Sequence, residues 1–187
     1  DLGNPLNCLF DNLDSYRWSV SASDGSFGSY SDPFNLKVQA YINIVMNISL
    51  IEFGNLGYLK NNDTSDNFPK PFILINEGNV LNDIDVEGTS LWQSVTNPTD
   101  NYKFKFDNVT TNGISENGSF NWTETIIGYS NIPLVADDIS DLVDLKYADT
   151  TDSVEVDINV TVPSSDGPGV KSSTITFTIE LGSGDTY

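Results

Sequence analysis

The sequence predicts an all-β protein, a β-sandwich preceded by an N-terminal arm. Apolar and polar residues alternate with a period of two in several separate stretches, as they do in half-buried strands. Clusters of Gly, Pro, Asn, Asp and Ser, which favour turns, separate these stretches. The 187 residues suffice for one domain with a sizeable core, and many short strands divided by turns are typical of a sandwich.

Residues 1–34 are expected to form the arm, and residues 35–187 the sandwich. Ser, Gly, Asn and Asp dominate this first part of the chain. A short alternating stretch over residues 16–22 includes Trp18 and Val20 on one face. Two interpretations remain open for Cys8, the single cysteine: an inert thiol, or a bridge to another chain.

The longest alternating stretch, residues 36–50, exceeds an ordinary strand. At about 3.3 Å per residue it would span roughly 50 Å, whereas a typical strand spans about 17–20 Å. Either the strand bends between the sheets of its own sandwich, or part of it serves the core of another subunit. In both cases the even positions are expected in an apolar core, and these are Leu36, Val38, Ala40, Ile42, Ile44, Met46, Ile48 and Leu50.

The later part of the chain is expected to supply the remaining strands. Alternating or continuous apolar stretches predict strands over residues 72–75, 84–86, 102–106, 120–122, 154–162 and 175–181. Residues 76–79 form a predicted turn, and residues 163–169 a predicted loop. One short helix is expected over residues 138–147, because Ile139, Leu142, Val143 and Tyr147 would share a face.

Charge and composition exclude several classes of function. Eight Lys and Arg against 27 Asp and Glu give a formal net charge of −19, which repels nucleic acid and anionic membrane surfaces. The absence of His, with one Cys, excludes a Ser-His-Asp triad, a Cys/His zinc site and an intrachain disulfide. The chain has no run of 18 apolar residues, so no membrane span is predicted. Abundant Asn, Ser and Thr, few cations and one thiol favour an extracellular or cell-surface protein.

Candidate modification sites are more numerous than candidate ligand sites. About four Asn-X-Ser/Thr triplets are expected by chance at this composition. The chain has six, and the candidate glycosylation sites are Asn47, Asn62, Asn108, Asn117, Asn121 and Asn159. No cofactor is expected beyond weak Ca²⁺ binding by two polar clusters that do not match the EF-hand spacing, for which a solvated acidic face is the simpler interpretation. These clusters are Asp137, Asp138, Asp141 and Asp144, and Asn61, Asn62, Asp63 and Asp66.

No catalytic residue is predicted. Paired carboxylates could in principle hydrolyse a glycoside, but no pair stands out in the sequence, so the chain is not expected to be an enzyme. Trp92, Trp122 and Tyr58 could form a sugar-stacking platform or pack in the core, and aromatic residues at sandwich positions favour the core.

Several short sequence segments, spread over residues 50–181, resemble those of a known group of modules. They are residues 53–56 (FGNL), 75–80 (INEGNV), 88–92 (GTSLW), 158–163 (INVTVP) and 173–178 (STITFT). Their order resembles the immunoglobulin-like modules of prokaryotic, mainly archaeal, cell-surface and extracellular proteins. As a single acidic subunit with an N-terminal arm, the chain also resembles the β-sandwich subunits of extracellular filaments: archaeal threads, archaeal bundling pili and the TasA biofilm fibre.

The resemblance implies an immunoglobulin-like (jelly-roll-like) β-sandwich that serves as the structural subunit of an extracellular filament. It also implies a head-to-tail homopolymer in which each subunit lends a strand to its neighbour. The donor-strand candidates are Trp18, Val20, Leu36, Val38, Ala40, Ile42, Ile44 and Met46. The alternative function is a monomeric carbohydrate-binding or adhesive cell-surface module.

Overall fold

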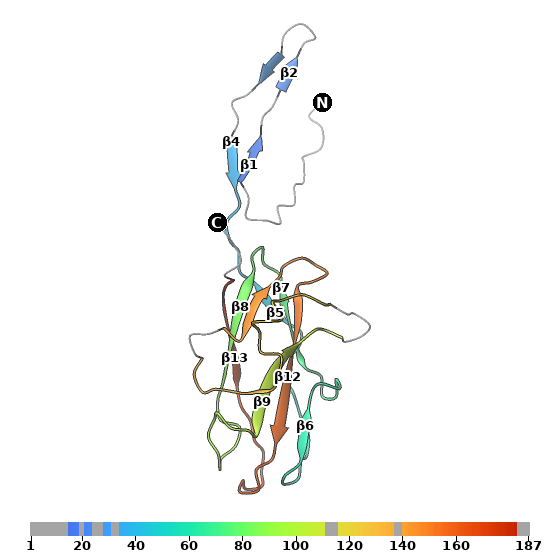
Figure 1. The fold of residues 1–187 in the computed structure, drawn as a ribbon, viewed down its shortest axis with the longest axis vertical. Helices are drawn as coiled ribbons and strands as arrows, with labels where there is room; N and C mark the ends of the chain where they lie inside the picture. The colour runs from blue at the N-terminus through green and yellow to red at the C-terminus, as the bar shows by residue number, and fades with distance from the viewer. Residues whose placement is uncertain are drawn as a thin grey trace.

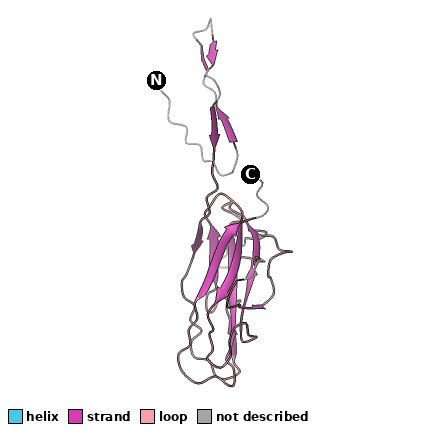
Figure 2. Ribbon diagram, turned by 90° about the vertical axis from the view of Figure 1, so that its left-hand side faces the viewer, coloured by secondary structure: helices cyan, strands magenta, loops and turns pink. Residues whose placement is uncertain are grey.

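The structure is a computed structural model that describes residues 15–18, 21–23, 28–30, 34–110, 116–136 and 140–182. Within these ranges the regular elements are all strands, and every strand pairing is antiparallel. Most of them belong to two sheets that share one apolar core, an arrangement consistent with a β-sandwich (Figures 1 and 2). The prediction of an all-β fold is therefore confirmed.

The larger sheet is organised around its longest strand, β12 (Ser153–Thr161). Its six strands run in the order β10–β9–β12–β7–β5, and β6 also pairs with β12. One side of β12 carries β9, while β7 and β6 share the other side, at residues 153–156 and 159–161 respectively. The bounds of these partners are β5 (Ile44–Met46), β6 (Asn61–Asp63), β7 (Phe72–Asn76), β9 (Tyr102–Asp107) and β10 (Ser130–Asn131).

The smaller sheet has three strands in the order β11–β8–β13. They are β11 (Leu142–Leu145), β8 (Asn82–Gly88) and β13 (Ile175–Leu181). All seven residues of β13 are in register with β8. Among the described residues no strand pairs with the other side of β13, which makes it an edge strand.

The core lies between the two sheets and follows from the alternation. Tyr102, Phe104 and Phe106 point inward from β9, and each is at most 3% exposed. The four inward residues of β12 are equally buried, and they are Val154, Val156, Ile158 and Val160. The rings of Phe72 and Phe177 meet edge to face across the sheets, with centroids 5.8 Å apart. Burial of these side chains stabilises the fold by about 1.5–3 kcal/mol each.

The first strands pair with one another. β1 (Ser15–Trp18) pairs with β4 (Phe34–Lys37), and β2 (Ser21–Ser23) pairs with β3 (Gly28–Tyr30). Figure 1 draws both ladders, in blue, outside the two-sheet body. The strand expected over residues 16–22 is thus divided between β1 and β2.

The stretch over residues 36–50 is divided in the same way. It contributes the end of β4, a segment without a strand, and β5. The segment before β5 follows the predicted turn: Tyr41 N donates to Asn79 Oδ1 at 2.7 Å, and Asn79 N donates to Tyr41 O at 3.0 Å. A Cβ on Gly78 would lie 2.3 Å from Tyr41 O, so this close approach requires glycine.

Burial along this stretch differs from the expected parity. Ile44 and Ile48 are half-buried and pack against the core, as expected. Ala40, Ile42, Met46 and Leu50 are exposed, so the expectation that they lie in a core is wrong for the single chain. The reason is that β5 is a short strand at the edge of the larger sheet, and β7 is its one partner among the described residues.

Two other predictions of local structure are wrong. Residues 138–147 contain no helix among those described, because Leu142 and Leu145 pair with β8 opposite Ile84 and Asn82. A bulge between the two leucines, with a positive φ of 57° at Asp144, allows both to point inward although their spacing is odd. Residues 120–122 form part of a loop rather than a strand, since two alternating aromatic residues are too few to define one.

The strands expected over residues 72–75, 84–86, 102–106, 154–162 and 175–181 are confirmed within one or two residues at most ends.

A core substitution should test this account of stability. Phe106 is fully buried on β9. We expect Phe106→Ala to lower the free energy of unfolding by about 3–5 kcal/mol, because it leaves a cavity between the sheets. Val170→Ala is the matched control, since Val170 is 98% exposed, and it should change stability by less than about 0.5 kcal/mol. Urea unfolding followed by circular dichroism measures both, and equal effects would contradict the core assignment.

Candidate functional site

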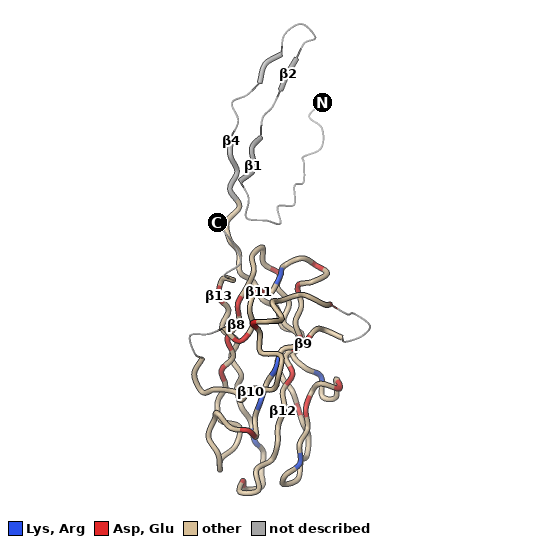
Figure 3. The backbone as a smooth tube through the Cα atoms, viewed as in Figure 1, with Lys and Arg blue, Asp and Glu red and all other residues tan. Residues whose placement is uncertain are grey.

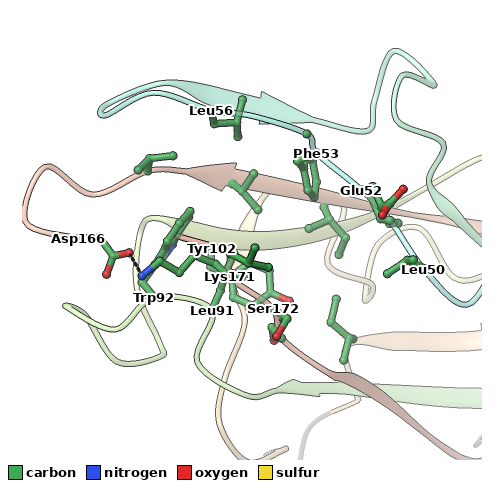
Figure 4. Close-up of a pocket in the computed structure, with 18 of the residues that line it drawn as sticks. Leu50, Glu52, Phe53, Leu56, Leu91, Trp92, Tyr102, Asp166, Lys171 and Ser172 are labelled. Atoms are coloured by element: carbon green, nitrogen blue, oxygen red, sulfur yellow. Dashed lines mark hydrogen bonds and ion pairs between the residues drawn. The ribbon is translucent and has the colours of Figure 1, made fainter. Parts of the chain in front are cut away.

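A groove with a volume of about 1280 Å³ opens between β13 and residues 49–58 (Figure 4). Its lining reaches the core, and inward residues of both sheets contribute to it. These residues are Phe72, Tyr102, Ile158, Val160, Ile175 and Phe177. The volume exceeds the roughly 300–1,000 Å³ that is usual for a small-molecule pocket. An extended peptide therefore matches the groove better than a compact ligand does.

The wall formed by β13 is an incompletely covered strand. Its inward residues are half-buried, whereas the inward residues of β9 and β12 are fully buried. These half-buried residues are Ile175, Phe177, Ile179 and Leu181. The backbone groups on the free edge of β13 have no neighbouring strand among the described residues. A strand edge and an apolar face thus meet at the groove, and this combination favours pairing with a further strand.

The opposite wall is an extended segment that is not in a strand. Phe53 and Leu56 are half-buried and pack against the core, and Figure 4 shows both facing the groove. Leu50 and Tyr58, also in the lining, are exposed. The exposed apolar side chains next to an open strand edge are typical of an interaction surface.

Asp166 stabilises one rim of the groove. Its Oδ1 accepts hydrogen bonds from Gln93 N and Ser94 N, both at 2.9 Å, and Lys171 Nζ lies 2.8 Å from its Oδ2. The hydrogen bond with Lys171 is the main reason why the pKa of Asp166 is lowered, and the bonds from Ser94 act in the same direction. The loop before β13 is thereby held against residues 91–95.

The floor near this rim carries polar groups that are already paired. Tyr102 OH donates to Ser173 Oγ at 3.1 Å, and Ser173 Oγ donates to the carbonyl of Thr89 at 2.6 Å. Burial raises the pKa of Tyr102. Trp92 is buried, with its indole N–H donating to Asn101 O at 3.1 Å. These bonds fix the aromatic floor without presenting a reactive group.

A second notable cluster lies on the outer face of the larger sheet. Lys105 Nζ is 2.6 Å from Asp107 Oδ2 and 3.2 Å from Asp157 Oδ2. Burial raises the pKa of Asp157. Burial by itself lowers the pKa of Lys105, but the hydrogen bond to Asp107 and the charge of Asp157 outweigh it, so that this pKa is raised. Burial and the neighbouring carboxylates also raise the pKa of Tyr129.

The two predicted polar clusters have structural roles where they are described. Asp141 Oδ2 accepts from Val86 N, and Asp144 N donates to Asp83 Oδ1. Asp63 and Asp66 cap turns in their own loop by accepting from Ser65 N and Phe68 N. Asp137 and Asp138 lie outside the described residues. Within those residues no group of three or more Asp, Glu, Cys or His side chains is placed to hold a metal ion, and no helix is long and apolar enough to cross a membrane.

The three aromatic residues for which the core is favoured over a sugar platform have different surroundings. Trp92 is buried, but Tyr58 and Trp122 are exposed, so the core expectation is wrong for these two. Trp92 and Tyr58 line the groove, whereas Trp122 is absent from its lining and stacks on Phe120, with ring centroids 5.5 Å apart. Cys8 lies outside the described residues.

The candidate glycosylation sites have different surroundings. Asn117 is exposed, Asn121 is half-buried, and the hydroxyl of Thr123 donates to Asn121 Oδ1 at 2.9 Å. Asn159 lies in β12, where it accepts a hydrogen bond from Asn61. Asn47 Oδ1 accepts from the backbone amides of Ile48 and Ile73. Asn62 and Asn108 are half-buried.

The donor-strand candidates are also spread over different elements. Trp18 belongs to β1 and Leu36 to β4, while Val20 lies outside the described residues. Ile44 and Met46 belong to β5 and pair with β7. The remaining candidates, which lie between β4 and β5, are Val38, Ala40 and Ile42.

Sequence reasoning did not identify the two features that the structure makes prominent. The free edge of β13 depends on which strands pair, and alternation alone does not show this. The Lys105 cluster had a signal in the sequence, because lysine is scarce and Lys105 alternates with core aromatic residues. Comparisons with protein-family models, with curated proteins and with solved structures found no match.

The pH dependence of the groove rim should follow from the lowered pKa of Asp166. In the unfolded chain the pKa of Asp166 is close to 3.8, and in the folded chain it is lower. The stability that this carboxylate contributes is therefore fully present above the unfolded-state pKa, and it is lost as the pH falls through the folded-state pKa. Hydrogen exchange should therefore show weaker protection of the Gln93 and Ser94 amides in acid.

Substitution tests the same contact at neutral pH. We expect Asp166→Ala to speed exchange of these two amides roughly tenfold or more, because charged hydrogen bonds are strong. Asp66→Ala serves as the matched control, since Asp66 accepts from Phe68 N in a separate loop, and it should leave both amides protected. Unchanged protection in Asp166→Ala would contradict the role given to this side chain.

Proposed function

We propose that the chain is the structural subunit of an extracellular, cell-surface filament that assembles head-to-tail by strand donation. In this proposal residues 35–187 form an immunoglobulin-like (jelly-roll-like) sandwich, and residues 1–34 act as its N-terminal arm. The observation that carries the proposal is the free edge of β13 above an open apolar groove. A strand from a second copy would pair with that edge and cover the half-buried side chains beneath it.

The dimensions of the groove support a donated strand. β13 has seven residues, so its free edge is about 23 Å long and accommodates a strand of similar length. Apolar side chains at alternate positions of the donor would enter the groove and contact Phe53, Leu56 and Phe177. Burial of apolar surface and new backbone hydrogen bonds would both favour this complex.

The pairings within the chain favour residues before 38 as the donor, because β1 to β4 pair with one another and, among the described residues, with neither sheet of the sandwich. β5 already pairs with β7, and the backbone of residues 39–43 is bonded to the turn at residues 77–79. The chain before this point carries Trp18, Val20 and Leu36 among its apolar residues. A donor at one end of the subunit and a groove along its body generate an open head-to-tail contact, and repetition of this contact produces a fibre.

A complementation experiment tests strand donation. Phe177→Asp places a charge in the groove and should abolish fibres, while circular dichroism shows a folded monomer. Deletion of residues 1–34 removes the donor and should also abolish fibres. Mixing the two variants pairs the intact donor of one with the intact groove of the other, so a 1:1 heterodimer is expected. Light scattering after size exclusion and electron microscopy measure these outcomes.

The control and the contradicting results are equally specific. Val170→Asp changes an exposed residue at the rim and should form fibres like the unmodified chain. Normal fibres from Phe177→Asp would contradict the assignment of the groove as the acceptor of the donated strand. Monomers in every mixture and in the unmodified chain would favour a monomeric adhesive or carbohydrate-binding module instead.

Assembly should also depend on ionic strength. Figure 3 shows Asp and Glu spread over the body, and the net charge of −19 makes neighbouring subunits repel each other. Raising the salt from about 0.01 M to 0.15 M shortens the screening length from about 30 Å to 8 Å. We expect more or longer fibres at the higher salt or with added Ca²⁺, as measured by light scattering. Equal assembly under all these conditions, including a chelator, would contradict this expectation.

A further inference from the structure

A lysine of the larger sheet is enclosed between two carboxylates. Lys105 and Asp157 are direct cross-strand partners in the β9–β12 ladder. Lys105 Nζ lies 3.2 Å from Asp157 Oδ2, and the two side chains are only 15% and 1% exposed. Asp107, two residues further along β9, places its Oδ2 2.6 Å from the same nitrogen. The strand pairing thus holds an amine and a buried carboxyl group in contact.

The surroundings fix the orientation of the Asp157 carboxylate. Thr64 Oγ1 donates to Asp157 Oδ1 at 2.7 Å and itself accepts from Ile158 N at 3.0 Å. Thr64 is fully buried, and its hydroxyl proton is directed to Asp157 by this pair of bonds. The other oxygen of Asp157 faces Lys105. The ring of Tyr129 adds a further side to the site, with its centroid 5.6 Å from Lys105 Nζ.

The cluster differs from an ordinary surface ion pair in two ways. A buried carboxylate is costly unless it is paired, and here one ammonium serves two carboxylates. The exposed pair between Lys103 and Asp100, in which the Asp100 side chain is 86% exposed, has neither burial nor a second carboxylate on the lysine. An amine and a carboxyl group are the two reactants of an amide, and a neighbouring carboxylate can move a proton between them.

We propose that Lys105 and Asp157 join in an intramolecular isopeptide bond, and that Asp107 transfers the proton. The lysine ammonium first passes one proton to the Asp157 carboxylate, which gives an amine and a carboxylic acid. Lys105 Nζ then attacks Asp157 Cγ. Asp107 takes one proton from the attacking nitrogen and delivers it to the departing hydroxyl group. One N–C bond forms, one C–O bond breaks and one water leaves, so no oxidant, metal or co-reactant is consumed.

The neighbouring groups assist each step. Contact between the reacting groups replaces a bimolecular encounter with a reaction inside a folded site. The Thr64 hydroxyl points at the oxygen on which negative charge develops during the attack. The low exposure of Asp157 favours its carboxylic acid form over the carboxylate, and it limits the access of water to the finished amide.

The bond would tie together two strands at the centre of the larger sheet. It would close a loop between residues 105 and 157 and so restrict the unfolded chain. This inference does not rest on the proposed function, because a cross-linked subunit is equally compatible with a filament and with a monomeric module.

Intact mass spectrometry of the denatured full chain tests the proposal. Once any glycan has been removed or its mass subtracted, the expected mass is that of the sequence less one water. Proteolysis should yield one branched peptide that joins the segments containing Lys105 and Asp157. A chain at the full sequence mass, with two separate linear peptides, would show an ion pair only and would overturn the bond.

Matched variants assign the roles. Lys105→Arg keeps the cation but cannot form this amide, and Asp107→Asn keeps the shape but loses the proton acceptor. Both should return to full mass while circular dichroism shows the native fold, and both should unfold at a lower temperature than the unmodified chain. Lys103→Arg, two residues away on the same strand, should still lack one water. A cross-linked Asp107→Asn chain would overturn the role of Asp107, and loss of the cross-link in Lys103→Arg would overturn its assignment to Lys105.

Discussion

The pairing of β12 is the interaction on which most of this structure depends. This strand contacts β9 along one side, and β7 and β6 along the other, so that it organises the larger sheet by itself. Its inward residues fill the core, while Asp157 on its outer face meets Thr64 and Lys105. One strand therefore supplies both the apolar packing and the partner of the buried charge cluster.

The smaller sheet shows what happens where such pairing is incomplete. β8 is flanked on both sides, and Ile84 and Val86 are fully buried. Among the described residues β13 is flanked on one side only, and Phe177 remains half-buried although it contacts Phe72 across the core. Burial in a sandwich depends on neighbours within the sheet as well as on the facing sheet. The groove lies beside β13, for which the described part of the chain supplies one neighbouring strand, and this arrangement is the basis of the proposed assembly.

Charge has different effects on the open surface and in the enclosed cluster around Lys105. The net negative charge makes copies of the chain repel one another unless ions screen it, which would oppose the proposed assembly. On the outer face of the larger sheet, the same shortage of cations leaves Lys105 to serve two carboxylates, Asp107 and Asp157. Burial strengthens these contacts, because the local dielectric is low, and it brings reactive groups into a fixed arrangement.

The sequence by itself determined the strands with strict alternation, because their period of two is local. It therefore predicted β12 and β13 closely, and also the turn at residues 76–79. It did not predict β11, because Leu142 and Leu145 are spaced as on a helix and become strand residues only through pairing with β8 and a bulge. The free edge of β13, the exposure of Ile42 and the contact of Lys105 with Asp157 were likewise decided by the tertiary structure. Each depends on which distant segment lies alongside, and that information is not contained in any local pattern of the chain.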